Sequence, residues 1–410
     1  MQNIVIVNLF NGAGGGVRIT LHIANILAER GYKVRLVALS GLPIDILDKI
    51  HGTNLAKYLW KNLYVKYLLD YQQAKYLLRF RLYVYQRYIK MLKGVIATYD
   101  PDIIVLFDDI PPIDWDSVKA RVLLYSHFPY AARLLYNIYD EIDSDYTNPF
   151  NILKERVLRS SILHRYFFIG SIKDLKKDIE VIANSTITSI FIKRVWDVDS
   201  KILFPFVVAP QSILLKKPLP TNLRPNIIVS LGVIAPGKHY GELIDTFSKV
   251  RQNLKNIKLI IMGSLVDKSY YRYLLRKIKS FGLEGKVFIF TDVNEEKKWE
   301  ILFRAKMYVH MKRFEPFGIA GAEAMYAGAI PIVYKGYTSG PWIDIVDKGK
   351  YGMGFRTIEE LVEAIYSVIT LDKNQLGELQ EKVFERAHNF SLEVFKARFT
   401  QLVEGGNKRL

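Results

Sequence analysis

Short apolar runs alternate with amphipathic segments along most of the chain. Residues 4–9 form a β-branched run typical of a buried parallel strand. Apolar positions within residues 17–29 recur at helical spacing before Gly31 ends the helix, and residues 34–39 form a second apolar run. Strand, helix and strand in this order predict a β–loop–α–β unit that opens a parallel sheet.

The same alternation continues to about residue 333 and is interrupted once. Residues 204–226 contain five prolines and little helical periodicity, which is typical of a linker. Further strands are predicted at residues 102–107, 120–125, 181–185, 227–231, 258–262, 287–290, 307–310 and 330–333, with a helix at about 240–251.

This pattern predicts an α/β protein with the doubly wound architecture, in which two Rossmann-like parallel-sheet domains face one another. We expect an amino-terminal domain over residues 1–205, a linker over 206–226 and a carboxyl-terminal domain over 227–385. A final helix within residues 386–410, capped by Ser391, is expected to pack back on the amino-terminal domain.

Residues 55–95 differ in composition from their surroundings. They contain nine Lys or Arg, eight tyrosines and a single acid, Asp70. A 4-3-4-3 apolar stripe, which predicts an amphipathic helix, is formed by Leu78, Leu82, Tyr85, Ile89 and Leu92. One interpretation places the segment on an anionic membrane surface, and the other packs the stripe on the sheet with a solvated basic face.

The composition of the chain limits which binding partners and which cellular compartment are expected. A length of 410 residues fits two domains. The composition, with 50% hydrophobic and 24% charged residues, excludes a disordered chain. The net charge of +17 indicates an anionic partner: nucleic acid, an acidic membrane face or phosphorylated substrates. The absence of cysteine excludes disulfides, thiolate nucleophiles and cysteine metal sites. Because no signal peptide or membrane-length apolar run is evident, we expect a cytoplasmic chain, at most peripheral on a membrane.

Two features of the amino-terminal half suggest a ligand site. A glycine cluster that includes Gly15 and Gly16 precedes the first predicted helix, where the backbone can approach a phosphate or a sugar closely. Its spacing fits neither the dinucleotide fingerprint nor the phosphate loop, so a tight turn without ligand is the alternative. His127 follows a strand and precedes Pro129, which suits a ring presented into a cleft, although an isolated histidine is more often structural.

The carboxyl-terminal half contains the strongest candidate chemistry. Strand 227–231 runs into Gly232 and then Lys238, whose ammonium can meet a diphosphate or lie in solvent. Further along, Glu315 precedes a helix expected to hold Pro316 in its first turn and Gly328 at its end. The free backbone amides of Phe317, Gly318 and Ile319 at the start of this helix then form an anion site. A second carboxylate, Glu323, can accept hydrogen bonds from sugar hydroxyls beside it.

Three Asp-x-Asp patterns raise the possibility of a metal site. They lie at residues 114–116, 143–145 and 197–199. Metal-dependent transferases hold divalent ions on the diphosphate with such pairs. None of the three falls next to the glycine loops or the carboxylate-bearing helix, so we expect surface loops and no metal ligands.

At this point the chain resembles a known family. Glu315 and Glu323, within E-P-F-G…E-A-M-Y-A-G, match the E-x7-E motif of glycosyltransferase family 4. The resemblance implies the GT-B architecture, retention of anomeric configuration, nucleotide-sugar donors and no essential metal. Gly15 and Gly16 look like the family's amino-terminal glycine loop. Residues 125–129 and 183–185 resemble the branch that mannosylates dolichol-linked oligosaccharides.

The resemblance also implies roles for the candidate residues. Glu323 would hold the ribose, and Glu315 with the backbone of residues 317–319 would hold the sugar. Lys238, at the end of the loop that begins at Gly232, would neutralise the departing diphosphate. His127 would contact the sugar ring or its 6-hydroxyl.

One position of the donor loop departs from the family pattern. Val233 stands where the family commonly has an arginine, which leaves Lys238 with more of the diphosphate charge. The partners implied are a nucleotide sugar, as substrate rather than cofactor, and a glycan or lipid-linked acceptor. Mannose and glucose fit equally as the donor sugar.

Two alternatives to a hexosyltransferase remain open from the residues. The basic, tyrosine-rich segment 55–95 suits single-stranded nucleic acid, although that function leaves the carboxylate-bearing helix without a role. The other alternative keeps the fold and loses turnover because of Val233, which would leave a sugar-binding scaffold.

Overall fold

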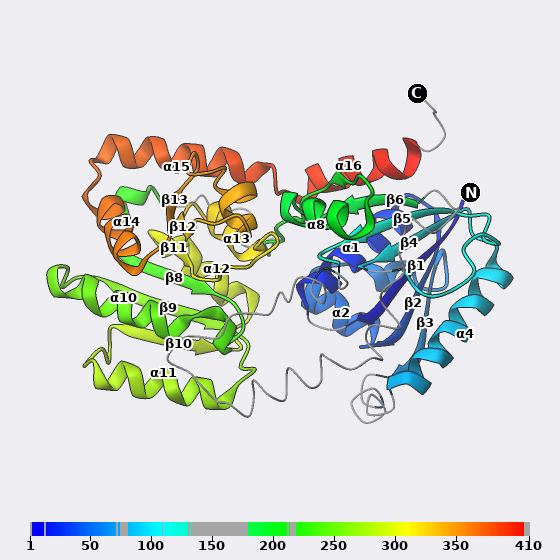
Figure 1. The fold of residues 1–410 in the computed structure, drawn as a ribbon, viewed down its shortest axis with the longest axis horizontal. Coiled ribbons are helices and arrows are strands. Elements are labelled where there is room, and N and C mark those ends of the chain that lie inside the picture. Colours follow the sequence, from blue (N-terminus) through cyan, green and yellow to red (C-terminus); the bar gives the residue numbers. More distant parts are fainter. Residues whose placement is uncertain are drawn as a thin grey trace. The chain divides into compact units, whose positions relative to one another are not determined.

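The chain divides into two compact units, each built on a parallel sheet (Figure 1). The computed structural model describes residues 2–11, 14–70, 73, 81–108, 110–129, 132, 179–210, 213 and 219–405. Described residues up to Phe204 belong to the first unit, and those from Pro205 onward belong to the second. Two Rossmann-like units confirm the expected α/β class.

The first unit is a sheet with strand order β3-β2-β1-β4-β5-β6-β7, parallel throughout. Its strands are β1 (Asn3–Asn11), β2 (Lys33–Gly41), β3 (Leu63–Asp70), β4 (Ile103–Phe107), β5 (Arg121–Ser126), β6 (Ile179–Ala183) and β7 (Lys201–Ile202). Its helices are α1 (Gly15–Glu29), α2 (Ile44–His51), η1 (Leu55–Tyr58), α4 (Arg81–Tyr99) and α8 (Thr186–Trp196).

Central strands of the first unit are buried on both faces. Val5 and Val7 pack in a cluster with residues of α4 and α8, whereas Ile4 and Ile6, equally buried, point to the opposite face. β4 is buried at every residue. Burial of both faces is the physical reason for its continuous apolar run.

The basic segment 55–95 folds differently from the membrane interpretation. Its first part contains β3, an edge strand that the sequence pattern did not indicate. On α4, the stripe residues Ile89 and Leu92 are buried against the sheet, and Tyr85 is partly buried beside them, so the described part of the stripe packs on the sheet and not on a membrane. Leu78 and the side chain of Leu82 lie outside the described residues.

The second unit is a sheet with strand order β10-β9-β8-β11-β12-β13, also parallel. Its strands are β8 (Ile227–Leu231), β9 (Lys258–Gly263), β10 (Val287–Thr291), β11 (Met307–His310), β12 (Ile330–Tyr334) and β13 (Met353–Phe355). Its longer helices are α10 (Tyr240–Asn253), α11 (Lys268–Ser280), α12 (Glu295–Arg304), α13 (Ile319–Tyr326), α14 (Ile358–Thr370), α15 (Lys373–His388) and α16 (Leu392–Glu404).

Helix caps in the second unit follow the sequence. The Ser391 hydroxyl accepts a hydrogen bond from the Val394 amide at 3.3 Å, which confirms the expected start of the final helix.

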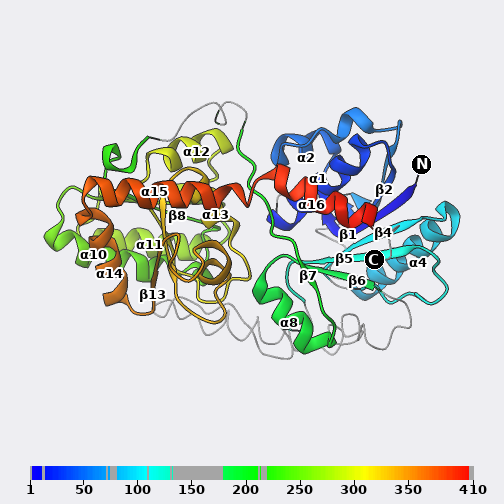
Figure 2. The ribbon, with the colours of Figure 1, turned by 90° about the horizontal axis from the view of Figure 1, so that it is seen from above.

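α15 lies across α13 (Figure 2). Phe395 of α16 packs on Phe206 of the same unit, with ring centroids 4.6 Å apart. Packing of α16 on the amino-terminal domain stays a prediction.

No helix among the described residues is both long enough and apolar enough to cross a membrane. The longest described helix, α4, has charged residues along its exposed side, among them Arg87 and Lys90.

Candidate functional site

The loop after β8 depends on one glycine. Gly232 has a φ of +148°, and a Cβ there would lie 2.9 Å from Cε of Lys238. The Tyr240 hydroxyl donates to the Gly232 carbonyl at 3.0 Å and holds the turn in place. Because Gly232 has no side chain, the aliphatic part of Lys238 can pass over the backbone at this point.

Three nitrogens converge on one oxygen of Glu315. Its Oε2 lies 3.5 Å from Nζ of Lys238, 3.7 Å from Nζ of Lys312 and 3.9 Å from Nε2 of His310. The structure therefore brings together Lys238 and Glu315, which the sequence placed in one site. It adds Lys312 and His310, which sequence reasoning missed.

The charge state of this cluster follows from burial and from the two lysines. Burial raises the pKa of Glu315, but Lys238 and Lys312 together outweigh it and lower the pKa to about 2. Burial lowers the pKa of His310 to about 3, so the ring is neutral at pH 7. Its Nδ1 lies 3.0 Å from the Tyr308 hydroxyl. Two ammonium groups facing one carboxylate leave a net positive charge.

The loop that carries Glu315 is fixed by the segment before residue 341. The Gly340 amide donates to the Glu315 carbonyl at 2.7 Å, and the Glu315 amide donates to the Thr338 carbonyl at 3.1 Å. Gly318 has a φ of +87°, and a Cβ there would lie 2.7 Å from Cγ of Pro341. Only glycine fits such a position without strain.

The helix after this loop starts later than the sequence suggested. α13 begins at Ile319 with Gly318 as its N-cap, so the expectation that Pro316 lies in its first turn is wrong. The left-handed conformation of Gly318 ends the loop and sets the start. The amides of residues 317–319 stand at the helix amino terminus, where the first N–H groups have no intrahelical acceptor. At the other end, Gly328 has a φ of +75° and terminates the helix as expected.

Glu323 lies in the second turn of α13 and is buried. Its Oε1 accepts a hydrogen bond from Nζ of Lys298 at 3.0 Å, and the same ammonium lies 2.8 Å from Oε2 of Glu295. Lys298 comes from α12, and no spacing in the sequence pointed to it. The buried Glu323 carboxylate therefore has a charged hydrogen-bond partner from the neighbouring helix.

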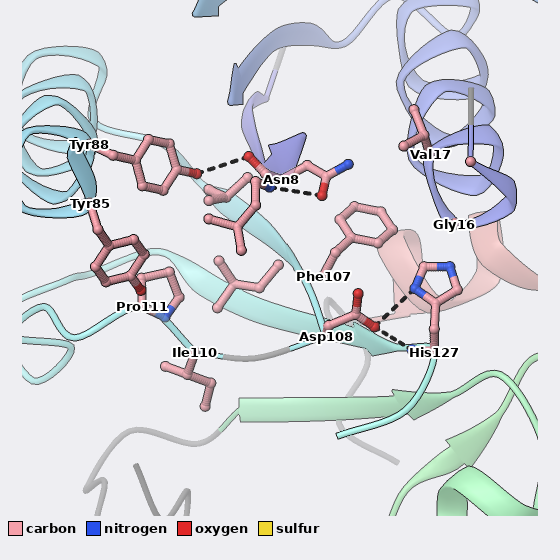
Figure 3. A pocket seen from close by; sticks show the side chains of 14 residues that line it. Asn8, Gly16, Val17, Tyr85, Tyr88, Phe107, Asp108, Ile110, Pro111 and His127 are labelled. Atoms are coloured by element: carbon pink, nitrogen blue, oxygen red, sulfur yellow. Dashed lines mark hydrogen bonds and ion pairs between the residues drawn. The ribbon is translucent and has the colours of Figure 1, made fainter. Parts of the chain in front are cut away.

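The first unit has its own pocket at the carboxyl ends of β1 and β4, about 300 Å³ in volume (Figure 3). Its polar end is formed by Asp108, His127 and Gly16. Its remaining walls are largely apolar and come from Val7, Leu9, Val17, Tyr85, Tyr88, Leu106, Phe107, Ile110 and Pro111. Gly15 begins α1 beside this pocket and is exposed.

Asp108 orients His127. Its Oδ1 accepts from the His127 backbone amide at 2.8 Å and lies 3.0 Å from Nδ1 of the ring (Figure 3). Burial opposes ionisation of Asp108, but His127 and the neighbouring amides lower the pKa of the carboxyl below its ordinary value. On its other side the ring lies against Gly16, where a Cβ would come within 3.2 Å of Cε1. Sequence reasoning missed Asp108, which directly follows β4.

The two amino-terminal segments that resembled the mannosyltransferase branch are neighbours. The Thr188 hydroxyl lies 2.9 Å from the His127 carbonyl oxygen and 2.7 Å from Oδ1 of Asn184. The Asn184 amide donates to the Ser126 carbonyl at 3.0 Å. Residues 126–128 are therefore positioned by the start of α8.

Two of the three Asp-x-Asp patterns lie among the described residues, and both are at the surface. Asp114 and Asp116 are exposed, while Asp197 and Asp199 lie 3.6 Å and 3.2 Å from Nζ of Lys193. Within the described ranges, no group of three His, Cys, Asp or Glu side chains is arranged to hold an ion. Residues 143–145 lie outside the described residues.

Two Rossmann-like parallel-sheet domains with carboxyl-terminal helices are the GT-B fold. The chain superposes on sucrose-phosphate synthase from Thermosynechococcus elongatus with a TM-score of 0.67, 15% identity and 99% coverage of both chains. It superposes equally on WaaG, a glycosyltransferase involved in lipopolysaccharide biosynthesis, with a TM-score of 0.67, 14% identity, and 98% and 100% coverage.

Sequence comparison gives the family. Residues 212–390 match the family model described as glycosyl transferases group 1. GDP-Man:Man(3)GlcNAc(2)-PP-Dol alpha-1,2-mannosyltransferase of Dictyostelium discoideum is 24% identical over 272 residues, which cover 63% of this chain and 52% of that protein. Alpha-1,3/1,6-mannosyltransferase ALG2 of the same organism is 34% identical over 94 residues, which cover 23% of this chain and 22% of that protein. Residues 212–390 therefore carry the pattern of the group 1 glycosyltransferases, and the alignment with the first relative spans about half of that protein's length.

Proposed function

We propose that the protein is a retaining glycosyltransferase that moves a hexose from a nucleotide sugar to a glycan or lipid-linked acceptor. One observation carries the proposal: Lys238 and Lys312 converge on Glu315 immediately before the amino terminus of α13. Two ammonium groups and a helix amino terminus suit a diphosphate. A carboxylate between them suits the hydroxyls of the attached sugar.

In the proposed reaction the second unit binds the donor. Glu323 accepts hydrogen bonds from the ribose, and Glu315 with the amides of residues 317–319 holds the sugar. Lys238 and Lys312 face the negative charge that builds on the departing diphosphate, which is an electrostatic contribution strongest where water is excluded. The departing phosphate takes the proton of the acceptor hydroxyl, so the step needs no side-chain base. Lysines rather than a metal ion supply the positive charge.

The first unit binds the acceptor in this proposal. Its pocket has a polar end at His127 and Asp108 and apolar walls that include Tyr85 and Ile110 (Figure 3). Such a site suits an acceptor that combines a hydroxyl with an apolar group, as a lipid-linked glycan does. The resemblance to a mannosyltransferase whose printed name includes a dolichol-linked acceptor supports a role in N-glycan precursor assembly.

A lipid-linked acceptor would place the protein at the cytoplasmic face of a membrane. In segment 55–95 the support comes from exposed side chains rather than from the apolar stripe. Trp60 is 82% exposed, and Lys57, Lys61, Arg87 and Lys90 are exposed as well. Tryptophan and basic side chains favour the headgroup region, so we propose a peripheral, reversible attachment without insertion of a helix.

The proposal is tested with a panel of nucleotide sugars, including GDP-mannose and UDP-glucose. Binding of the correct donor is expected to raise the melting temperature by mass action, and transfer is measured on lipid-linked and soluble acceptors. Glu323→Gln should abolish both effects. Glu295→Gln is the matched control, because Glu295 contacts the same lysine but lies at the surface. Full transfer by Glu323→Gln would contradict the assignment, and donor binding without any turnover would favour a sugar-binding scaffold.

A further inference from the structure

Helix α11 of the second unit carries a dense face of positive charge. Its 13 residues contain no acid. Lys268, Arg272, Arg276 and Lys279 are exposed, and none of them forms an ion pair with another described residue. Because an α-helix has 3.6 residues per turn, these four side chains and Leu275 fall within about 100° of the helix surface. We call these five residues the α11 basic face.

The opposite side of α11 fixes the helix to the domain. Tyr270, Leu274 and Ile278 are buried in the core of the second unit. The fifth cation, Lys277, turns inward, and its ammonium lies 2.6 Å from Oδ2 of Asp245. The α11 basic face is therefore held in a fixed orientation at the outer edge of this unit, on the side of β10 (Figure 1).

An exposed apolar side chain accompanies the charge. Leu275 is 43% exposed within the α11 basic face. Asp267 uses its carboxylate to cap the helix amino terminus, where it accepts hydrogen bonds from the amides of Ser269 and Tyr270. Within the described part of the chain it forms no ion pair with any of the four cations.

We propose that the α11 basic face binds an anionic lipid bilayer. The four cations contact headgroup phosphates, and Leu275 enters the interfacial layer. The apolar side chain favours a bilayer over nucleic acid, because a phosphodiester backbone offers Leu275 no apolar partner. The proposal concerns the second unit, is separate from segment 55–95, and does not depend on sugar transfer.

The test is flotation of the full chain with phosphatidylcholine vesicles of graded phosphatidylglycerol content. A variant with Lys268, Arg272, Arg276 and Lys279 changed to Gln is expected to lose at least about tenfold in apparent affinity. The matched control changes Lys255, Lys297, Lys373 and Lys382 to Gln, which removes the same charge from exposed positions of the same unit. This control should float nearly as wild type does.

A second variant separates insertion from charge. Leu275→Ser should weaken flotation while leaving its dependence on salt unchanged, since the number of phosphate contacts stays the same. Equal flotation of the quadruple variant and its matched control overturns the proposal. The proposal is also overturned if the protein binds a single-stranded oligonucleotide more tightly than anionic vesicles and the quadruple variant weakens that oligonucleotide binding. Sugar transfer to a soluble acceptor tests the proposed function independently of both results.

Discussion

The ammonium of Lys238 lies 3.5 Å from the carboxylate of Glu315, and 76 residues separate the two along the chain. The contact requires the missing side chain at Gly232, over which Lys238 passes. It also requires the loop held by Gly340, which carries Glu315. Lys312 approaches the same oxygen, and we propose that it supplies the positive charge that an arginine at position 233 would otherwise provide.

Loss of either lysine is expected to weaken catalysis. Lys238→Ala should lower kcat/KM by about 100-fold, equivalent to about 2.7 kcal/mol of transition-state stabilisation, and Lys312→Ala by about tenfold. Steady-state kinetics with the best donor provide the measurement. Lys297→Ala is the control, because Lys297 pairs only with Glu300 at the surface among described residues. If Lys312→Ala keeps full activity, Lys312 is not the substitute cation.

The free energy of unfolding should decrease as the pH is lowered below 6.5, in part because of His310. The pKa of His310 is about 3 in the folded chain and near 6.5 when unfolded, so the unfolded state binds the extra proton below pH 6.5. Each such histidine then reduces the free energy of unfolding by up to about 1.4 kcal/mol per pH unit. His22, with a pKa of about 4, behaves alike. Glu315 adds its own loss only from about pH 4.5 down to about 2.

Substitution isolates the His310 contribution. His310→Gln should remove about half of the slope that His310 and His22 together give between pH 6.5 and 5. Urea unfolding at several pH values within this window is the measurement. The exposed His388 serves as control through His388→Gln. An unchanged slope in His310→Gln would show that the histidine is not buried as a neutral ring.

Gly318 and Gly377 should respond to alanine in opposite directions. Gly318→Ala forces a side chain into the left-handed conformation and against Pro341, at an expected cost of about 1–3 kcal/mol. Gly377 lies inside α15 with open space around it, so Gly377→Ala should stabilise by about 0.5–1 kcal/mol. Chemical denaturation measures both. A harmless Gly318→Ala would mean that the loop carrying Glu315 is less constrained than its contacts indicate.

Asp108→Asn is expected to lower kcat while donor binding persists. Asp108 has a φ of +65°, a conformation that asparagine tolerates, so the fold should be retained. The amide removes the charge that orients the His127 ring, and a misplaced group of this kind costs about 10- to 100-fold. Turnover and the donor-induced rise in melting temperature are measured side by side. A loss of both turnover and the donor-induced rise in melting temperature would show that Asp108 is needed for folding and not only for positioning the His127 ring.

Much of the fold follows from local pattern. β8 occupies the predicted residues, and α1, α10 and α16 begin within a few residues of their expected positions. These elements are apolar at regular intervals or capped by their own side chains, so their formation depends on neighbours in sequence. β3 was missed because a half-exposed edge strand rich in tyrosine and lysine lacks a clear period.

The sequence by itself determined the α/β class with two Rossmann-like domains, and it singled out Glu315, Glu323 and Lys238. Tertiary structure decided which groups surround them. Lys298 and Asp108 lie within 4 Å of Glu323 and His127 because chain packing brings separate segments together, whereas Lys312 reaches Glu315 within one loop, three residues away. The fate of the apolar stripe on α4 was decided in the same way. An amphipathic period is the same whether its apolar side meets a sheet or a membrane, and only the packed structure shows that it meets the sheet.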